Sequence, residues 1–219
     1  ALKLAEIHFE WAKNENRPHE QAKALAGKGD ALYHLDSLQK SALAYLESAQ
    51  ILENLPEKDS SLIANVYHNA GANYYDLGVS DLAENYLKKS IPYAKKMSDS
   101  EVLVGNYANL AHLFYQTGNY EKALIYNDTC LQIDRELKDT LSVASDLRLT
   151  GIINIRFGNH TEGVEYLKEA LDLTDAKKYP REYCKALNTL GVGYMDIWDY
   201  ENALKYFNKS LELSRQLKD

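Results

Sequence analysis

The sequence is poor in residues that cross-link a chain or interrupt its helices. Only two of its 219 residues are cysteines and only four are prolines. Two cysteines, Cys130 and Cys184, cannot build the disulfide framework of a small secreted domain. Free thiols favour a reducing compartment such as the cytoplasm. A periplasmic sensor region is the alternative location. The scarcity of proline leaves no room for a low-complexity linker.

The chain also lacks an excess of basic residues and any long apolar run. Its formal net charge is −7, whereas proteins that bind nucleic acid carry a basic stripe that displaces counterions. The same charge argues against an anionic membrane surface. No apolar run approaches the roughly 18 residues of a spanning helix, and no charged-then-apolar leader opens the sequence. We therefore expect neither a nucleic-acid partner nor direct membrane contact by this segment.

The motifs that commonly carry catalysis are missing as well. The sequence has no cysteine pair at metal-binding spacing, no His-Glu-x-x-His, no glycine-rich phosphate loop and no Gly-x-Ser-x-Gly. His68 and His112 stand one repeat plus one helical turn apart, so a zinc site with Asp76 is conceivable, but a polar groove lining is the favoured interpretation. The prediction is a protein that is not an enzyme, with no catalytic residue, cofactor or metal.

What the sequence does have is a period of about 40 residues. A small residue recurs at gaps of 41, 40, 40 and 40, and a tyrosine always follows it three residues later. The small residues are Ala42, Ala83, Ala123, Gly163 and Ala203, and the tyrosines are Tyr45, Tyr86, Tyr126, Tyr166 and Tyr206. Because no single unit of this length can bury its apolar face alone, such a period indicates stacked supersecondary units.

Each unit has the pattern of two amphipathic helices joined by a tight turn. In the third full repeat, the apolar spacing predicts helices over 100–117 and from 120 to about 137, separated by Gly118. Asp59, Asp99 and Asp139 precede helices at equivalent places, where a carboxylate caps free N–H groups. Elsewhere Pro18 and Pro180 take the first helical position.

These columns resemble the tetratricopeptide repeat family. In the last repeat the pattern is Leu187, Leu190-Gly191, Tyr194, Ala203 and Phe207, and the other repeats follow it with local departures. The resemblance implies an all-α, right-handed superhelix: one orphan N-terminal helix and five helix-turn-helix repeats. We expect the tyrosine column to be structural and to pack between second helices, with its hydroxyl groups at the rim.

The register predicts a single continuous solenoid. Its parts are 1–16 (the second helix of a truncated preceding repeat), 17–58, 59–98, 99–138, 139–178 and 179–219. Solenoids usually need polar caps at both ends, and none is visible here, so the chain is interpreted as a fragment of a longer protein. Exposed apolar residues near the first end, Ile7, Phe9 and Trp11, are expected to promote end-to-end self-association.

The 40-residue period exceeds the common 34, and resembles that of kinesin light chains, cell-polarity adaptors, Gram-positive peptide-pheromone receptors and Bacteroidetes sensor regions. The wording around Asp139 most resembles the last group. The predicted function is a non-enzymatic protein- or peptide-binding scaffold that uses the concave face, as the sensor or adaptor part of a larger regulator. The alternative is a purely structural arm of a multidomain enzyme or receptor, with no ligand of its own.

The resemblance places the ligand on the concave face, which the first helix of each pair lines. Asparagine offers a donor and an acceptor to a peptide backbone, two tyrosines share one slot as an amphipathic wall, and basic residues near the far end favour an acidic group on the ligand. The predicted peptide-binding residues are Asn65, His68, Asn69, Tyr75, Asn109, His112, Tyr115, Arg148, Arg156, Lys185 and Asn188.

Overall fold

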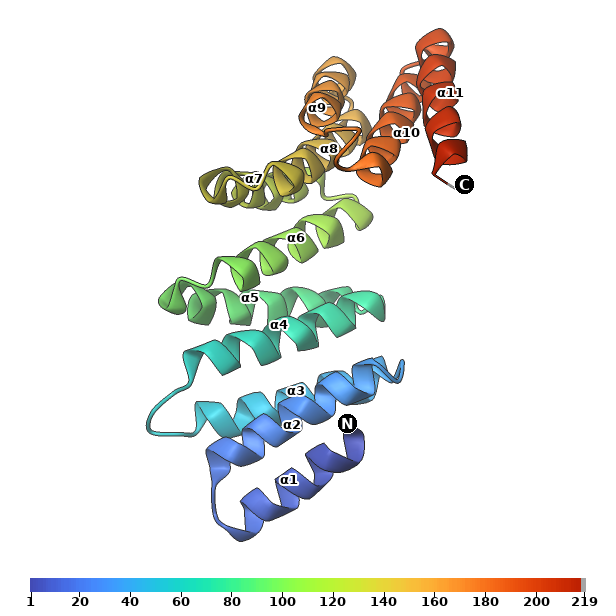
Figure 1. Ribbon diagram of the computed structural model, residues 1–219. Coiled ribbons are helices and arrows are strands. Elements are labelled where there is room, and N and C mark those ends of the chain that lie inside the picture. Colours follow the sequence, from blue (N-terminus) through green and yellow to red (C-terminus); the bar gives the residue numbers. More distant parts are fainter. Residues whose placement is uncertain (218–219) are drawn as a thin grey trace. The chain divides into compact units, whose positions relative to one another are not determined.

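The computed structural model describes residues 1–217, and within them it contains eleven α-helices and no strand (Figure 1). The all-α fold of one single helix followed by five helix pairs is therefore confirmed. The helices are α1 (Leu2–Asn14), α2 (Pro18–Tyr33), α3 (Leu38–Glu53), α4 (Ser60–Asp76), α5 (Ser80–Met97), α6 (Ser100–Gln116), α7 (Tyr120–Leu137), α8 (Thr140–Phe157), α9 (His160–Leu173), α10 (Pro180–Asp196) and α11 (Tyr200–Gln216).

The capping aspartates act as predicted. Asp59 accepts a hydrogen bond from the backbone N–H of Leu62 at 3.0 Å, and Asp99 does the same for Val102 at 3.1 Å. Asp139 accepts from two N–H groups in the first turn of α8. These bonds satisfy donors that have no partner inside the helix, which fixes where each first helix begins.

The turns inside the pairs depend on glycine at three equivalent places. Gly78, Gly118 and Gly158 have φ values of 72°, 76° and 100°. This left-handed conformation costs glycine nothing, whereas a β-carbon would strain it. The turn after each of α4, α6 and α8 is thus encoded locally, and the second helix starts two residues later.

Contacts between residues divide the chain into two compact units, Ala1–Leu113 and the part from Phe114 onward. In the first unit the closest association is between α4 and α5, and in the second it is between α8 and α9. Helices that follow one another in sequence lie side by side within each unit (Figure 1). The repeat boundaries and the single continuous solenoid stay predictions.

Small residues of the repeat let paired helices approach closely. A β-carbon placed on Gly71 would lie 2.8 Å from the Leu87 side chain, and one on Gly151 would lie 2.7 Å from the backbone oxygen of Gly163. Real side chains essentially never make such contacts. The small-residue column is therefore a packing requirement between the two helices of a pair.

The tyrosines of the column are structural. Tyr126 stacks on Phe114 with ring centroids 5.5 Å apart, and Tyr206 stacks on Tyr194 at 5.5 Å. Each stacking partner belongs to the first helix of the same pair and stands twelve residues earlier, and was not predicted. The cause of the stacking is the antiparallel pair itself, which brings these two positions onto facing surfaces. Tyr166 on α9 also packs against a cluster that includes Leu131 of α7, which agrees with the predicted packing between second helices.

The apolar residues near the start of the chain are partly exposed. Ile7 is 57% and Trp11 is 43% exposed, while Phe9 is half-buried. These exposed apolar groups could contact a second copy of the chain, and the self-association stays a prediction. Within residues 1–217, none of the helices combines the length and apolar character that crossing a membrane would need.

Candidate ligand-binding face

The predicted peptide-binding residues lie on the first helices of the pairs, and we call these positions, in each unit by itself, the first-helix face. In the first unit these residues are Asn65, His68, Asn69 and Tyr75 on α4, and Asn109 and His112 on α6; in the second they are Tyr115 on α6, Arg148 and Arg156 on α8, and Lys185 and Asn188 on α10.

Two of the predicted residues, His68 and Asn69, line a cavity of about 500 Å³ in the first unit. We call it the Asp30 cavity, since the Tyr45 hydroxyl donates a 2.6 Å hydrogen bond to Asp30 Oδ1 at its edge. Burial and this bond to a carboxylate raise the pKa of Tyr45. No lysine or arginine lines this cavity, whereas the carboxylates of Asp30 and Asp76 do. Its character is therefore acidic and aromatic.

His68 is held in one tautomer by a chain of hydrogen bonds. The Asn106 side-chain N–H₂ donates to Ser90 Oγ at 2.8 Å, so its Oδ1 faces His68 Nδ1, 3.1 Å away, as an acceptor. Nδ1 must then carry the proton, and Nε2 is left as an acceptor. Burial lowers the pKa of His68, which keeps the ring neutral at neutral pH. The ring packs against Gly105, where a β-carbon would lie 2.8 Å away.

In the second unit, three predicted residues line a cavity of about 240 Å³: Tyr115, Arg156 and Asn188. We call it the Arg156 cavity. Arg156 Nη2 lies 3.9 Å from Asp196 Oδ2, and the Tyr115 hydroxyl and this carboxylate raise the pKa of the guanidinium. The positive charge of Arg156 is thus already partly balanced by the protein. Apolar side chains, among them that of Ile155, form the rest of the wall.

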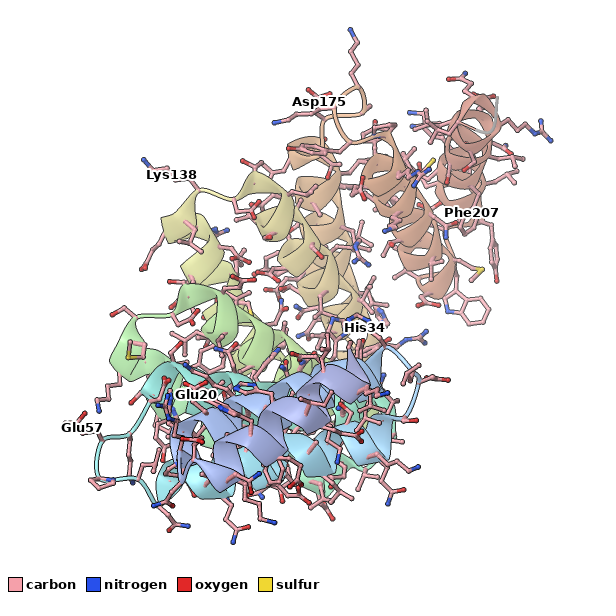
Figure 2. All side chains as sticks on the ribbon, turned by 60° about the horizontal axis from the view of Figure 1, so that its bottom comes forward. Glu20, His34, Glu57, Lys138, Asp175 and Phe207 are labelled. Carbon is pink, nitrogen blue, oxygen red and sulfur yellow. The ribbon has the colours of Figure 1, made fainter. Side chains whose placement is uncertain are left out.

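Two further predicted residues, Arg148 and Lys185, line a separate cavity of about 260 Å³, the Arg148 cavity. It is lined by the N-terminal halves of α8 and α10, which follow the connections in which Figure 2 labels Lys138 and Asp175. Ser142 and Glu182 also line it. The structure therefore divides the basic residues that the sequence grouped together: Arg148 and Lys185 share one cavity, and Arg156 belongs to another.

The other four predicted residues lie on first helices but outside these three cavities. The Asn65 side chain donates to the Ser61 carbonyl at 2.9 Å, so part of its hydrogen-bonding capacity is used within α4. The half-buried Asn109 side chain makes no hydrogen bond among residues 1–217 and is available to a ligand. Tyr75 and Tyr115 belong to different units, and their predicted side-by-side wall stays a prediction.

Residues that sequence reasoning did not assign to the site complete the cavities. Tyr45 belongs to the tyrosine column, which was interpreted as structural only, and neither Asp30 nor Ser142 was assigned to the site. The pairing of Asp30 with Tyr45 joins two positions 15 residues apart on different helices. The signal in the sequence was Asp30 itself, because the other repeats have glycine or alanine at this position.

A buried pair of carboxyl groups in the second unit also escaped prediction. Asp134 on α7 is 4% exposed and interacts with Asp146 on α8. Burial first, and then the neighbouring carboxylate, raise the pKa of Asp146 to about 8; burial also raises that of Asp134. Like charges this close cannot both ionise without cost, so the pair retains one proton near neutrality. Asp134 stands four residues after the buried Cys130, on the inward stripe of its helix, and this was the signal in the sequence.

The zinc alternative at His68, His112 and Asp76 finds no support in the structure. His68 uses its Nδ1 on Asn106. In the part of the chain that the structure describes, no three histidine, cysteine or acidic side chains come together in an arrangement suited to a metal ion.

Two tetratricopeptide-repeat family models match the chain, over residues 103–176 and 184–217. These matches, the helix pairs and the glycine packing agree, so the chain is built of tetratricopeptide repeats. The narrower resemblance to Bacteroidetes sensor regions stays a prediction.

A curated relative is response regulator aspartate phosphatase J of Bacillus subtilis (strain 168). It is 22% identical to this chain over 193 residues, which make up 88% of this chain and 49% of that protein. The chain thus spans about half the length of this relative. What the whole relative does cannot be transferred on this basis.

Solved structures share the fold. The crystal structure of BtubC from P. vanneervenii superposes with a TM-score of 0.80 at 16% identity, over 99% of this chain and 91% of that one. A Rap protein in complex with Competence and Sporulation Factor superposes with a TM-score of 0.68 at 16% identity, over 93% of this chain and 56% of that one. Likeness at this level of identity shows the fold alone.

Proposed function

We propose that this chain is a non-enzymatic protein- or peptide-binding scaffold whose ligand lies along the first-helix face. The observation that carries the proposal is that seven of the eleven predicted ligand residues line cavities. Their linings combine polar groups that fix orientation with apolar walls, which is typical of binding sites. Among the proteins of similar fold, a Rap protein is known in complex with Competence and Sporulation Factor.

The ligand that fits best is an extended peptide with an acidic group. Asn109 and Asn188 offer amides with no hydrogen bond to the described protein, and an amide can pair with a peptide backbone whatever its sequence. Arg148, Arg156 and Lys185 concentrate positive charge on the first helices of a chain whose net charge is −7. A local charge against the overall sign favours a ligand of opposite charge.

The role that we propose is the ligand-recognition part of a larger regulatory protein. The chain spans about half of its relative, response regulator aspartate phosphatase J, whose name refers to response regulators. Such a role needs varied polar contacts on the ligand-binding face, which the helix pairs of each unit provide. A purely structural arm would need no unpaired amides or guanidinium on this face.

The test uses peptides selected from a random display library on the immobilised chain. Asn109→Ala should weaken every selected peptide by about 1–2 kcal/mol, because a desolvated backbone group loses its partner. Arg156→Ala should weaken acidic peptides only, and its effect should shrink as salt is raised. Binding would be measured by isothermal titration calorimetry at two salt concentrations.

The matched controls lie on second helices. Asn85→Ala on α5 and Arg135→Ala on α7 remove the same side chains from exposed positions off the first-helix face, and should leave binding unchanged. If Asn109→Ala and Arg156→Ala bind the selected peptides as the unchanged chain does, the ligand does not use this face. A library that yields no binder at all would favour the structural-arm alternative.

A further inference from the structure

Arg148 is a half-buried charge for which the protein supplies no partner. Its guanidinium makes no hydrogen bond or ion pair with any of residues 1–217. Burial is the only influence that lowers its pKa, and no carboxylate acts in the opposite direction. Glu182 lines the same cavity but does not pair with it. Removing a charge from water without compensation is costly, so buried charges are normally paired.

Apart from Glu182, which does not pair with Arg148, the surroundings of Arg148 supply positive charge and hydrogen-bond donors. Lys185 on α10 lines the same cavity of about 260 Å³ and makes no ion pair among the described residues. Ser145, one turn before Arg148, has an exposed hydroxyl group on the cavity wall. A planar guanidinium with an ammonium and a hydroxyl group beside it matches a carboxylate, which accepts paired hydrogen bonds from arginine.

Arg156, two helical turns further along α8, shows the contrast. The two arginines are about 12 Å apart along the helix axis at 1.5 Å per residue. Arg156 already faces Asp196 at 3.9 Å and is largely exposed, whereas Arg148 is half-buried and unpaired. Only one of the two is therefore placed so that a ligand anion would supply a missing partner.

We infer that the Arg148 cavity is the site that takes a carboxylate of the bound peptide, with Arg148 as its bidentate partner and Lys185 as the second cation. This inference rests on the proposed function and sharpens it, because it assigns the direct contact with the acidic group to one cavity and leaves Arg156, which already faces Asp196, only a longer-range contribution that salt screens. The carboxylate belongs to an aspartate or glutamate side chain or to the peptide C-terminus. The two sources present the same chemistry to the guanidinium.

The experiment follows the Nε–Hε resonance of Arg148 by NMR while small blocked compounds are added to the intact chain. The probes are acetyl-glutamate N-methylamide, which carries a side-chain carboxylate, acetyl-glycine, which carries a terminal one, and acetyl-glutamine N-methylamide, which is neutral. At least one carboxylate probe should shift the resonance saturably, and the neutral probe should not. The stronger of the two carboxylate probes identifies the source.

Variants then assign the contacts. Lys185→Ala should weaken the carboxylate probe about threefold to fivefold, as for a partly exposed charge. The matched control is the resonance of Arg135, whose guanidinium already lies 3.8 Å from Glu169 on an exposed surface, and it should not move saturably. If the Arg148 resonance does not respond, or responds equally to the glutamine compound, the inference is wrong.

A second measurement separates a ligand site from a structural residue. Arg148→Met keeps the apolar stem but removes the charge, so the free protein should melt at the same temperature or higher, while the response to carboxylate is lost. A clear fall in Tm would show a structural partner for the guanidinium and would overturn the inference.

The two proposals can fail independently. If library peptides bind but show neither a preference for acidic residues nor any sensitivity to Arg148→Met, the carboxylate site is wrong and peptide binding stands. If no peptide binds while the small carboxylate still shifts Arg148, the proposed function is wrong and the anion site stands.

Discussion

The two compact units have the same helix-pair architecture but differ in whether their buried polar side chains find hydrogen-bond partners. In the first unit, Ser90 donates to the Ala64 carbonyl at 2.7 Å and accepts from Asn106, which in turn accepts from His68. In the second unit, the buried side-chain oxygens Asn127 Oδ1 and Asp146 Oδ2 have no partner, and these are the orphaned buried atoms among residues 1–217.

The charged residues that line the cavities of the two units differ as well. The Asp30 cavity of the first unit has carboxylates and no lysine or arginine, and its histidine His68 is neutral. The Arg148 cavity of the second unit contains an arginine with no counterion. A repeat fold fixes where side chains are placed and leaves their chemistry free. The buried polar groups of the first unit are therefore satisfied by one another, whereas the second unit retains buried groups that respond to pH or to a ligand.

The largest expected effect comes from a substitution that breaks the packing between two helices of the second unit. Gly151→Ala places a β-carbon 2.7 Å from the Gly163 backbone oxygen, which cannot move aside, and should lower the free energy of unfolding by about 2–3 kcal/mol. Gly27→Ala is the matched control. It has no atom within 4 Å and should stabilise by about 0.5–1 kcal/mol, because alanine favours helix over glycine.

Denaturant unfolding measures both changes. Equal effects of the two variants would show that helix propensity alone decides, and that the close approach of α8 and α9 is not required for folding.

A second substitution tests whether the polar network of the first unit contributes to stability. Ser90→Ala leaves the Asn106 amide without its partner in a buried place and removes the second hydrogen bond to the Ala64 carbonyl, and should cost about 2 kcal/mol. It should also release His68, because Asn106 becomes free to rotate; the histidine NMR resonances report this. Ser80→Ala, at the half-buried start of α5, is the control and should cost less. A loss no larger than the control's would contradict the contrast between the units.

The third test concerns the carboxyl pair of the second unit and its dependence on pH. The pKa of Asp146 is raised to about 8, above its ordinary value near 4, so the folded state binds a proton that the unfolded chain has released. The contribution of this pair to the free energy of unfolding is therefore greatest at low pH, and it declines as pH rises from about 4 to about 8. The carboxylate of Asp139 adds repulsion to Asp134, and no lysine or arginine offsets the repulsion within the pair.

Asp146→Asn should remove this decline and raise the free energy of unfolding at pH 7 by about 1–2 kcal/mol, because the amide can donate to Asp134 without ionising. The measurement is thermal unfolding from pH 5 to pH 9. Asp172→Asn, at an exposed position of α9, is the control and should leave the profile unchanged. A variant with the same pH profile as the original chain would rule out the pair as its cause.

Much of the fold followed from local signals in the sequence. The helices predicted over 100–117 and 120–137 were found as Ser100–Gln116 and Tyr120–Leu137. Capping carboxylates and left-handed glycines act within a few residues of themselves, so their effect can be derived without tertiary structure. The small-residue column could also be predicted, since its repetition in every unit leaves packing as the common cause.

The partners of side chains across helices were decided by the tertiary structure. The sequence placed Arg148 and Arg156 on the same face of one helix, but only the packed structure gives Arg156 a partner in Asp196 and leaves Arg148 without one. The stacking of Tyr126 on Phe114 and the meeting of Asp134 with Asp146 likewise join different helices. Helix period and caps depend on neighbours along the chain, whereas charge pairing and burial depend on distances in space, which a repeat pattern alone does not contain.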